Sequence, residues 1–77
     1  MNKTRRTELI KLQDTINVVK ERLALLLEEE EEARDNMPES LQSSERYERT
    51  ETACENLQNA IDFLEEASES IEEAYQQ

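Results

Sequence analysis

Carboxylates are the residues of this chain that could do chemistry, and many of them lie in its second half. The stretch from Thr50 to Gln77 carries eight Asp and Glu and no Lys or Arg. Paired carboxylates act as general acid and base when a sheltered cleft separates their pKa values. Here Glu65–Glu66 and Glu72–Glu73 are neighbours in sequence, so on a helix they point in different directions. Because the chain also has no histidine to serve as a base, we expect no enzymatic activity, no catalytic residue and no cofactor.

The remaining metal-binding and nucleophilic candidates have simpler interpretations. Glu28 to Glu32 could bind a divalent cation loosely, but a helix spreads such a run around its axis and forms no cage. We therefore expect a solvated helix face and no metal site. Cys54 is the only cysteine, and we expect a small buried core residue. The alternative, a reactive thiol, would want a cationic neighbour.

Seven carboxylates of the second half recur at spacings of three, four or seven residues, so on a helix they line one flank. We call this set the acidic rail. Its members are Glu48, Glu51, Glu55, Asp62, Glu65, Glu69 and Glu72. One helical turn rises about 5 Å, comparable with the rise of about 3.4 Å per phosphate on one DNA strand. The rail could thus occupy the basic surface of a protein that binds nucleic acid. The alternative is that it only keeps the chain soluble and pairs within it.

The overall charge limits the classes of partner. The chain has 77 residues and a formal net charge of −11, which disfavours direct binding to nucleic acid or an anionic membrane and favours basic proteins. No apolar run approaches the ~18 residues of a membrane span. The basic start, Met1 to Arg6, is followed by no continuous apolar segment of the kind a signal peptide has. We expect a cytoplasmic protein with no membrane partner.

The stretch from Tyr47 to Tyr75 must position the rail. Its core positions alternate at spacings of three and four, which is the seam of a packed, coiled-coil-like helix. These seam positions are Tyr47, Thr50, Cys54, Leu57, Ile61, Leu64, Ser68, Ile71 and Tyr75. The absence of glycine, the single proline and the 38% of charged residues also favour an all-α chain over a sheet with tight turns.

A first helix is expected over about residues 4–36, capped by Asn2 or Thr4. Its predicted seam is Leu9, Leu12, Ile16, Val19, Leu23, Leu26, Ala33 and Met37. Glu30 interrupts this seam, so we expect looser packing there.

The chain breaks once, at about residues 37–43. Pro38 disfavours helix in the residue before it, Leu41 is the apolar anchor expected to close the core, and Ser43 or Ser44 caps a second helix over about residues 44–75. A link this short joins antiparallel neighbours. The sequence therefore predicts a single domain, residues 1–77, folded as an antiparallel two-helix hairpin.

The charges predict how the two helices are aligned. Folded back, the basic start of the first helix lies beside the acidic end of the second, and the acidic end of the first lies beside Arg46 and Arg49. This register places Lys20 near Glu65 and Arg34 near Glu51. Exposed ion pairs contribute only about 0–1 kcal/mol each, so they select the register more than they hold the fold.

Apolar residues outside the seams predict self-association. Two helices alone seldom stabilise so short a chain, and a flank of small and apolar residues remains. Its members are Val18, Leu25, Ala53, Ala60, Phe63 and Ala67. We expect a homodimer that forms a four-helix bundle; the alternative is that this flank binds a different protein.

The loop carries a resemblance to a known group of proteins. Arg34 to Glu48 reads RDNMPESLQSSERYE, followed by Glu55-Asn56-Leu57 and Ala60-Ile61-Asp62. This resembles small acidic proteins encoded by phages and prophages, which commonly read Asp-Asn-(Ile/Met)-Pro-Glu-(Asn/Ser)-Leu-Gln and then Ser-Glu-Arg-Tyr. The likeness covers roughly residues 34–66, and Ser43 stands where those proteins commonly have Gly. It implies a small phage accessory protein, a class that includes inhibitors of host defence such as some anti-CRISPR proteins.

Together these observations predict a non-catalytic acidic binding protein. In its sharpest form it is a phage-encoded inhibitor, located in the host cytoplasm, that occupies the basic nucleic-acid-binding surface of a host protein. The alternative is a self-assembling structural module or assembly factor with no inhibitory role.

Overall fold

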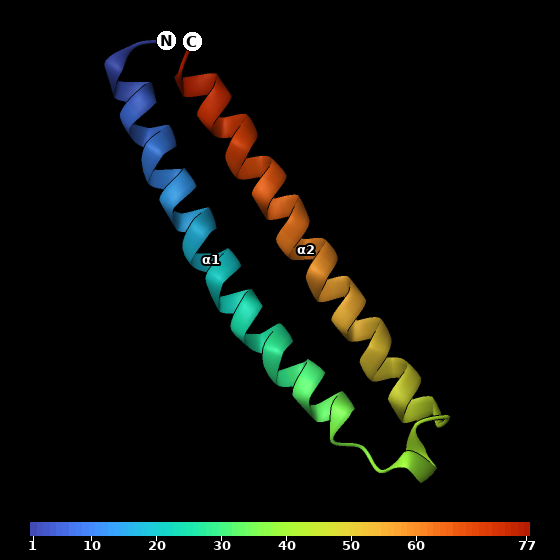
Figure 1. Cartoon of the computed structure of the whole chain (residues 1–77). Coiled ribbons are helices and arrows are strands. Elements are labelled where there is room, and N and C mark those ends of the chain that lie inside the picture. The colour runs from blue at the N-terminus through green and yellow to red at the C-terminus, as the bar shows by residue number, and fades with distance from the viewer.

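Two long helices lie side by side in opposite directions (Figure 1). The computed structural model describes residues 1–77. Helix α1 spans Lys3–Asp35 and helix α2 spans Glu45–Tyr75, and the loop between them contains a short 3-10 helix, η1, at Glu39–Leu41. The Cα atoms extend over 59 × 15 × 12 Å, and both termini lie at the same end of the rod. The predicted all-α hairpin is confirmed, whereas its pairing into a four-helix bundle stays a prediction.

Both helices begin at polar N-cap residues that were among the predicted candidates. The Asn2 side chain accepts a hydrogen bond from the Arg5 backbone N–H at 2.8 Å. The Ser44 hydroxyl accepts one from the Tyr47 backbone N–H at 3.2 Å. Each cap satisfies one of the N–H groups that have no partner within the first turn. Of the two candidates at each start, Asn2 and Ser44 are therefore the caps.

The loop is held by its backbone and not by an apolar anchor. Pro38 precedes η1, and its carbonyl oxygen accepts a hydrogen bond from the Leu41 N–H at 2.8 Å. The Leu41 carbonyl oxygen in turn accepts from both the backbone N–H and the hydroxyl of Ser44. The Leu41 side chain remains exposed. The prediction that it closes the core is wrong, because these hydrogen bonds turn the chain without it.

The predicted seam of α2 is confirmed. All nine seam residues from Tyr47 to Tyr75 are buried or half-buried, with Cys54 and Ser68 the most enclosed. The alternation of three and four residues therefore identified the side of α2 that faces α1.

The predicted seam of α1 is wrong at every second position. Leu9, Ile16, Leu23 and Met37 are half-buried as expected, but Leu12, Val19 and Leu26 retain 54%, 44% and 53% of their accessible surface, and Ala33 is also exposed. The residues one position later are Gln13, Lys20, Leu27 and Arg34, and these are buried or half-buried. The edge of the apolar stripe of α1, and not its centre, therefore faces α2.

A ladder of hydrogen bonds between the helices accounts for this rotation. The Gln13 amide donates to the Ser68 carbonyl at 3.1 Å and accepts from the Tyr75 hydroxyl at 2.8 Å. The Ser68 hydroxyl donates to the Asn17 side chain at 3.2 Å. Ser68 is buried, and a buried hydroxyl without partners would cost roughly 1–3 kcal/mol. Polar side chains of α1 must therefore face α2 at this level.

The predicted register is confirmed by the contacts at the middle and at the open end. Lys20 Nζ lies 3.9 Å from Glu65 Oε1. At the open end, Arg6 Nε donates to the Tyr75 carbonyl at 2.7 Å and Nη2 donates to the Gln77 carbonyl at 3.3 Å. Arg6 therefore satisfies carbonyl groups at the end of α2, where a cation is also favoured by the helix dipole.

One predicted ion pair is wrong. Arg34 was expected beside Glu51, but its guanidinium bonds Asp35 Oδ1 at 3.0 Å. Arg34 sits at an inner position, where its neighbour in sequence offers the closer carboxylate.

We predict that Leu27→Ala lowers the free energy of unfolding by about 2–4 kcal/mol, because Leu27 is the buried leucine of α1 and its removal leaves a cavity. Leu25→Ala is the matched control, since Leu25 is 62% exposed, and we expect a change within about 0.5 kcal/mol. Urea unfolding followed by circular dichroism measures both. Equal losses in the two variants would contradict the observed rotation of α1.

Candidate binding surfaces

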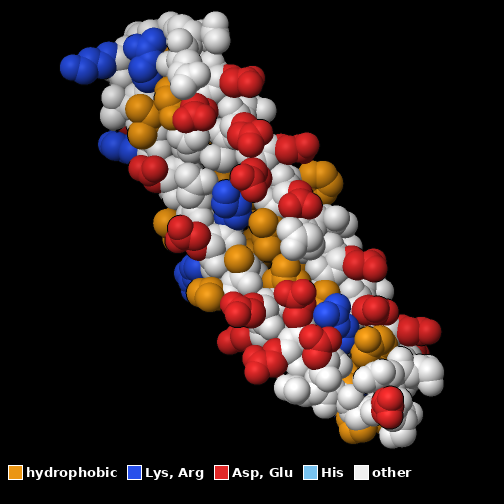
Figure 2. Space-filling view, in the orientation of Figure 1, with side chains coloured by type: hydrophobic (Ala, Val, Ile, Leu, Met, Phe, Trp, Pro, Cys, Tyr) orange, Lys and Arg blue, Asp and Glu red, His pale blue; other side chains and the backbone are white.

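The acidic rail lies on the surface along almost the whole of α2. All seven carboxylates from Glu48 to Glu72 are exposed. Figure 2 shows acidic side chains spaced along the α2 edge of the rod, while basic side chains gather near the start of α1. The helix thus presents the rail residues together, as their spacing predicted.

Little within the chain neutralises this rail. Glu65 is the one member with an ion pair, to Lys20 at 3.9 Å. Asp62 accepts from the Gln58 amide at 3.1 Å, and Glu72 accepts a long bond of 3.5 Å from the Tyr75 hydroxyl. The proximity of this carboxylate also contributes to the raised pKa of Tyr75, after the larger effect of desolvation. Internal pairing therefore accounts for a small part of the charge on α2.

A second surface is apolar and lies on one side of the hairpin. Leu12, Val19 and Leu26 each precede an inner residue of α1, and Ala53, Ala60 and Ala67 each precede an inner residue of α2. Because the helices are antiparallel, residues that precede the inner positions lie on the same side of both. We call these six residues the apolar face. Asn17 and Glu65 lie on the opposite side of the hairpin, because they follow the inner residues Gln13 and Ile61 by four positions. Their contacts with Ser68 and Lys20 are therefore on that side.

The residues predicted for self-association are only partly brought together. Ala53, Ala60 and Ala67 are half-buried on the apolar face, and Phe63, 67% exposed, lies beside them on α2. Val18 and Leu25 are 54% and 62% exposed. They lie midway between inner positions of α1, so they point away from α2.

Leu12, Val19 and Leu26 are the surface residues that sequence reasoning missed, because it placed them in the seam. The available signal was the polar pair Gln13 and Asn17, which falls opposite Ser68 in the predicted register. A buried serine requires polar neighbours, and satisfying it turns the leucines outward.

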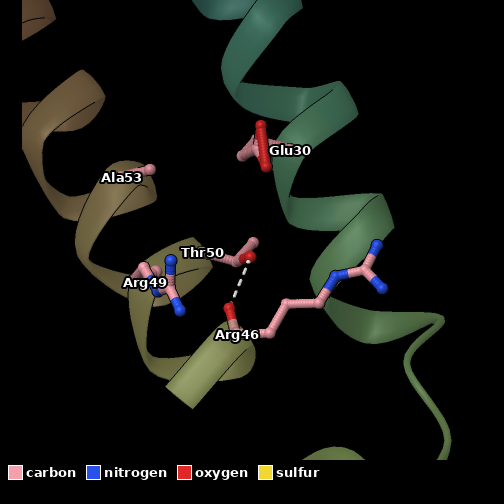
Figure 3. Close-up of a pocket in the computed structure, with 5 residues that line it drawn as sticks. All are labelled: Glu30, Arg46, Arg49, Thr50 and Ala53. Carbon is pink, nitrogen blue, oxygen red and sulfur yellow. Dashed lines mark hydrogen bonds between the residues drawn. The ribbon is translucent and has the colours of Figure 1, made fainter. Parts of the chain in front are cut away.

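An open pocket lies between the helices near the loop end, also on the side of the apolar face. Glu30 from α1 and Arg46, Arg49, Thr50 and Ala53 from α2 line it (Figure 3). The Thr50 hydroxyl donates to the Arg46 carbonyl at 3.0 Å. Glu30 is half-buried and takes an inner position here, as expected where it interrupts the seam. The predicted proximity of the acidic end of α1 to Arg46 and Arg49 is confirmed.

Cys54 is a buried thiol, as predicted. Burial raises its pKa; the carboxylates of Glu31 and Glu30 add to this shift, while the nearby Arg34 guanidinium opposes it. The net effect keeps the thiol protonated, which is the less reactive form.

Searches for a metal site, for a membrane-spanning helix and for similar proteins give no further indication of function. No group of His, Cys, Asp and Glu side chains is arranged to hold a metal ion, and neither helix has the apolar length that crossing a membrane takes. Comparisons with protein-family models, with curated proteins and with solved structures find no match for this chain.

We predict that Cys54 reacts with a thiol reagent at pH 8 about 100-fold more slowly in the folded protein than in urea, because reaction requires opening of the hairpin. A Cys54→Ala, Ser70→Cys chain is the control, since Ser70 is exposed on α2. It should react at similar rates folded and unfolded.

The same burial sets the sign of a pH dependence. The folded-state pKa of Cys54 is raised, so this contribution to stability is present at neutral pH and is lost as pH rises through the ordinary thiol pKa toward the raised one. Comparing wild type with Cys54→Ala over that alkaline range measures it. A wild-type stability that rises with alkaline pH relative to Cys54→Ala would contradict it.

Proposed function

We propose that this protein is a non-catalytic binding module whose acidic rail binds the basic surface of a partner protein. The observation that carries the proposal is that all seven rail carboxylates are exposed while only Glu65 has a cationic partner. A rail needed for internal pairing would be largely paired.

The geometry of the rail fits an extended basic groove. Glu48 and Glu72 lie 24 residues apart on a continuous α-helix, which corresponds to about 36 Å at 1.5 Å per residue. A row of carboxylates on a rod of this length presents its charge in a line, as a nucleic-acid strand does with phosphates. Proteins that bind nucleic acid with Lys and Arg are therefore the class of partner that the rail suits, and like charge disfavours nucleic acid itself.

The sharper form of this proposal is an inhibitor, encoded by a phage, that occupies the nucleic-acid site of a host protein. It rests on the resemblance over roughly residues 34–66, strongest in the stretch from Arg34 to Glu48, in addition to the rail. Competition between the protein and nucleic acid for one basic groove would be its mechanism.

A second candidate function is a self-assembling structural module. The exposure of Leu12, Val19 and Leu26 in heptad spacing favours it, because such a row is the surface that a packed helix normally buries. This function needs no basic partner.

We predict that neutralising the rail releases its partners. The tagged protein is used to capture proteins from a bacterial lysate and is eluted with rising salt and, separately, with duplex DNA. The rail variant carries Glu48→Gln, Glu55→Gln, Asp62→Asn and Glu69→Gln. It should retain its clients at least ~10-fold less well, because screening and charge removal weaken the same contact.

A control variant of equal net charge isolates the rail from total charge. It carries Glu→Gln at Glu21, Glu28, Glu29 and Glu32, which are exposed on α1, and it should bind like wild type. Equal losses in both variants, clients that persist at high salt and in DNA, or no client at all would each contradict the proposal. The last result with self-assembly would favour the structural module.

A further inference from the structure

The apolar surface of α1 is too broad for one neighbour. Leu27, Cys54 and Ser68 are the only buried residues of the whole chain, and nine large apolar side chains are exposed. Leu12, Val19 and Leu26 each lie three residues after one of the half-buried residues Leu9, Ile16 and Leu23, so the two rows are neighbours on the surface of α1. The exposed row is therefore half of an apolar stripe whose other half is already packed.

The apolar face has a large row and a small row. Leu12, Val19 and Leu26 project from α1 at intervals of seven residues, and Ala53, Ala60 and Ala67 recur on α2 at the same interval. Seven residues correspond to about 10.5 Å along a helix. Large side chains of one hairpin can therefore enter the spaces over the small side chains of another, as in knobs-into-holes packing.

The shape of the rod also fits a dimer. Its Cα atoms extend over 59 × 15 Å, so one whole broad side of the hairpin has an outline on the order of 900 Å², close to the roughly 800 Å² per partner that a stable interface buries. The apolar face forms the middle of such a side, over about 21 Å of each helix, and a partner of equal length would cover the rest.

We propose that the apolar face binds a second copy of this chain, with α1 of each protomer packed on α2 of the other about a two-fold axis parallel to the rods. Charge distribution selects this pairing. All Lys and Arg except Arg46 and Arg49 lie in α1 or its first turns, whereas α2 carries the rail. Packing α2 on α2 would bring two strongly acidic helices together. Packing α1 on α2 avoids this, because α1 is nearly balanced, with seven Lys and Arg against nine Asp and Glu.

The register within one hairpin carries over to this dimer, because rotation about an axis along the rod keeps every residue at its level. The Lys20–Glu65 and Asn17–Ser68 contacts place Val19 about level with residues 64–66 of α2. Val19 thus meets its partner chain between Ala60 and Ala67. This inference deepens the second candidate function and is independent of the rail, so its failure would leave the acidic binding proposal standing.

The test compares adjacent residues of the same type. Val19→Lys with Leu26→Lys places charges on the apolar face, and Val18→Lys with Leu25→Lys places the same charges on the outward side of α1. Sedimentation equilibrium should give a dimer for wild type and for the outward variant. The apolar-face variant should dissociate at least ~100-fold more readily, because it loses buried apolar side chains in each protomer.

The proposal can still be tested if the apolar-face variant fails to fold. If folding depends on dimerisation, the melting temperature of wild type and of the outward variant rises with protein concentration, and that of the apolar-face variant is lower and does not. A wild type that is monomeric at millimolar concentration, with a melting temperature independent of concentration, would overturn the proposal and assign the face to a different protein. A dimer broken equally by the outward variant would move the interface to Val18 and Leu25.

Disulfide formation tests the arrangement. In a Cys54→Ala background, one chain carries Val19→Cys and a second carries Ala67→Cys. The mixed pair should crosslink on oxidation, and Val19→Cys alone should not. Efficient crosslinking of Val19→Cys with itself would overturn the α1-on-α2 pairing, because it requires α1 to pack on α1.

Discussion

The structure depends on a mismatch between α1 and the single helix beside it. The apolar stripe of α1 is wider than one seam, and α2 covers its edge. The hairpin consequently buries very little of itself, although both helices are long and regular. In an amphipathic helix of a folded protein the centre of the stripe normally faces the core. Here it faces outward, so the uncovered half of the apolar stripe on α1 is the main apolar surface that the chain leaves unburied.

Polar contacts across the seam determine which half is covered. Gln13, Asn17, Ser68 and Tyr75 form hydrogen bonds that exist in one rotation and one register of the helices. Such partly buried polar groups add little net stability, since water competes for the same bonds. Their effect is on uniqueness: sliding α2 by one heptad, or turning α1 by one residue, would break these hydrogen bonds. The same contacts hold the rail on the side of the hairpin opposite the apolar face.

The helical hairpin could be predicted from the sequence because its signals are local. Asn2 and Ser44 at the caps, Pro38 in the loop and the alternation through Cys54 and Ile61 each specify structure within a few residues. The rotation of α1 could not be predicted from periodicity, because Leu12 and Gln13 are both compatible with a helix seam and the choice depends on Ser68, which lies far away in sequence. The rail was predictable as a line of exposed carboxylates. Its partner is encoded in another molecule, and no local pattern in this one specifies it.

Arg6 bonds carbonyl groups at and just beyond the end of α2, and this has a mechanical consequence. It fastens the beginning and the end of the chain to each other, so both backbone ends leave from one pole of a rod whose Cα atoms extend over 59 Å. A neighbouring domain joined at either end would sit at that pole. The Pro38 turn would then be held at the tip of a stiff arm, free to reach across a distance that a flexible tether of the same composition would not maintain.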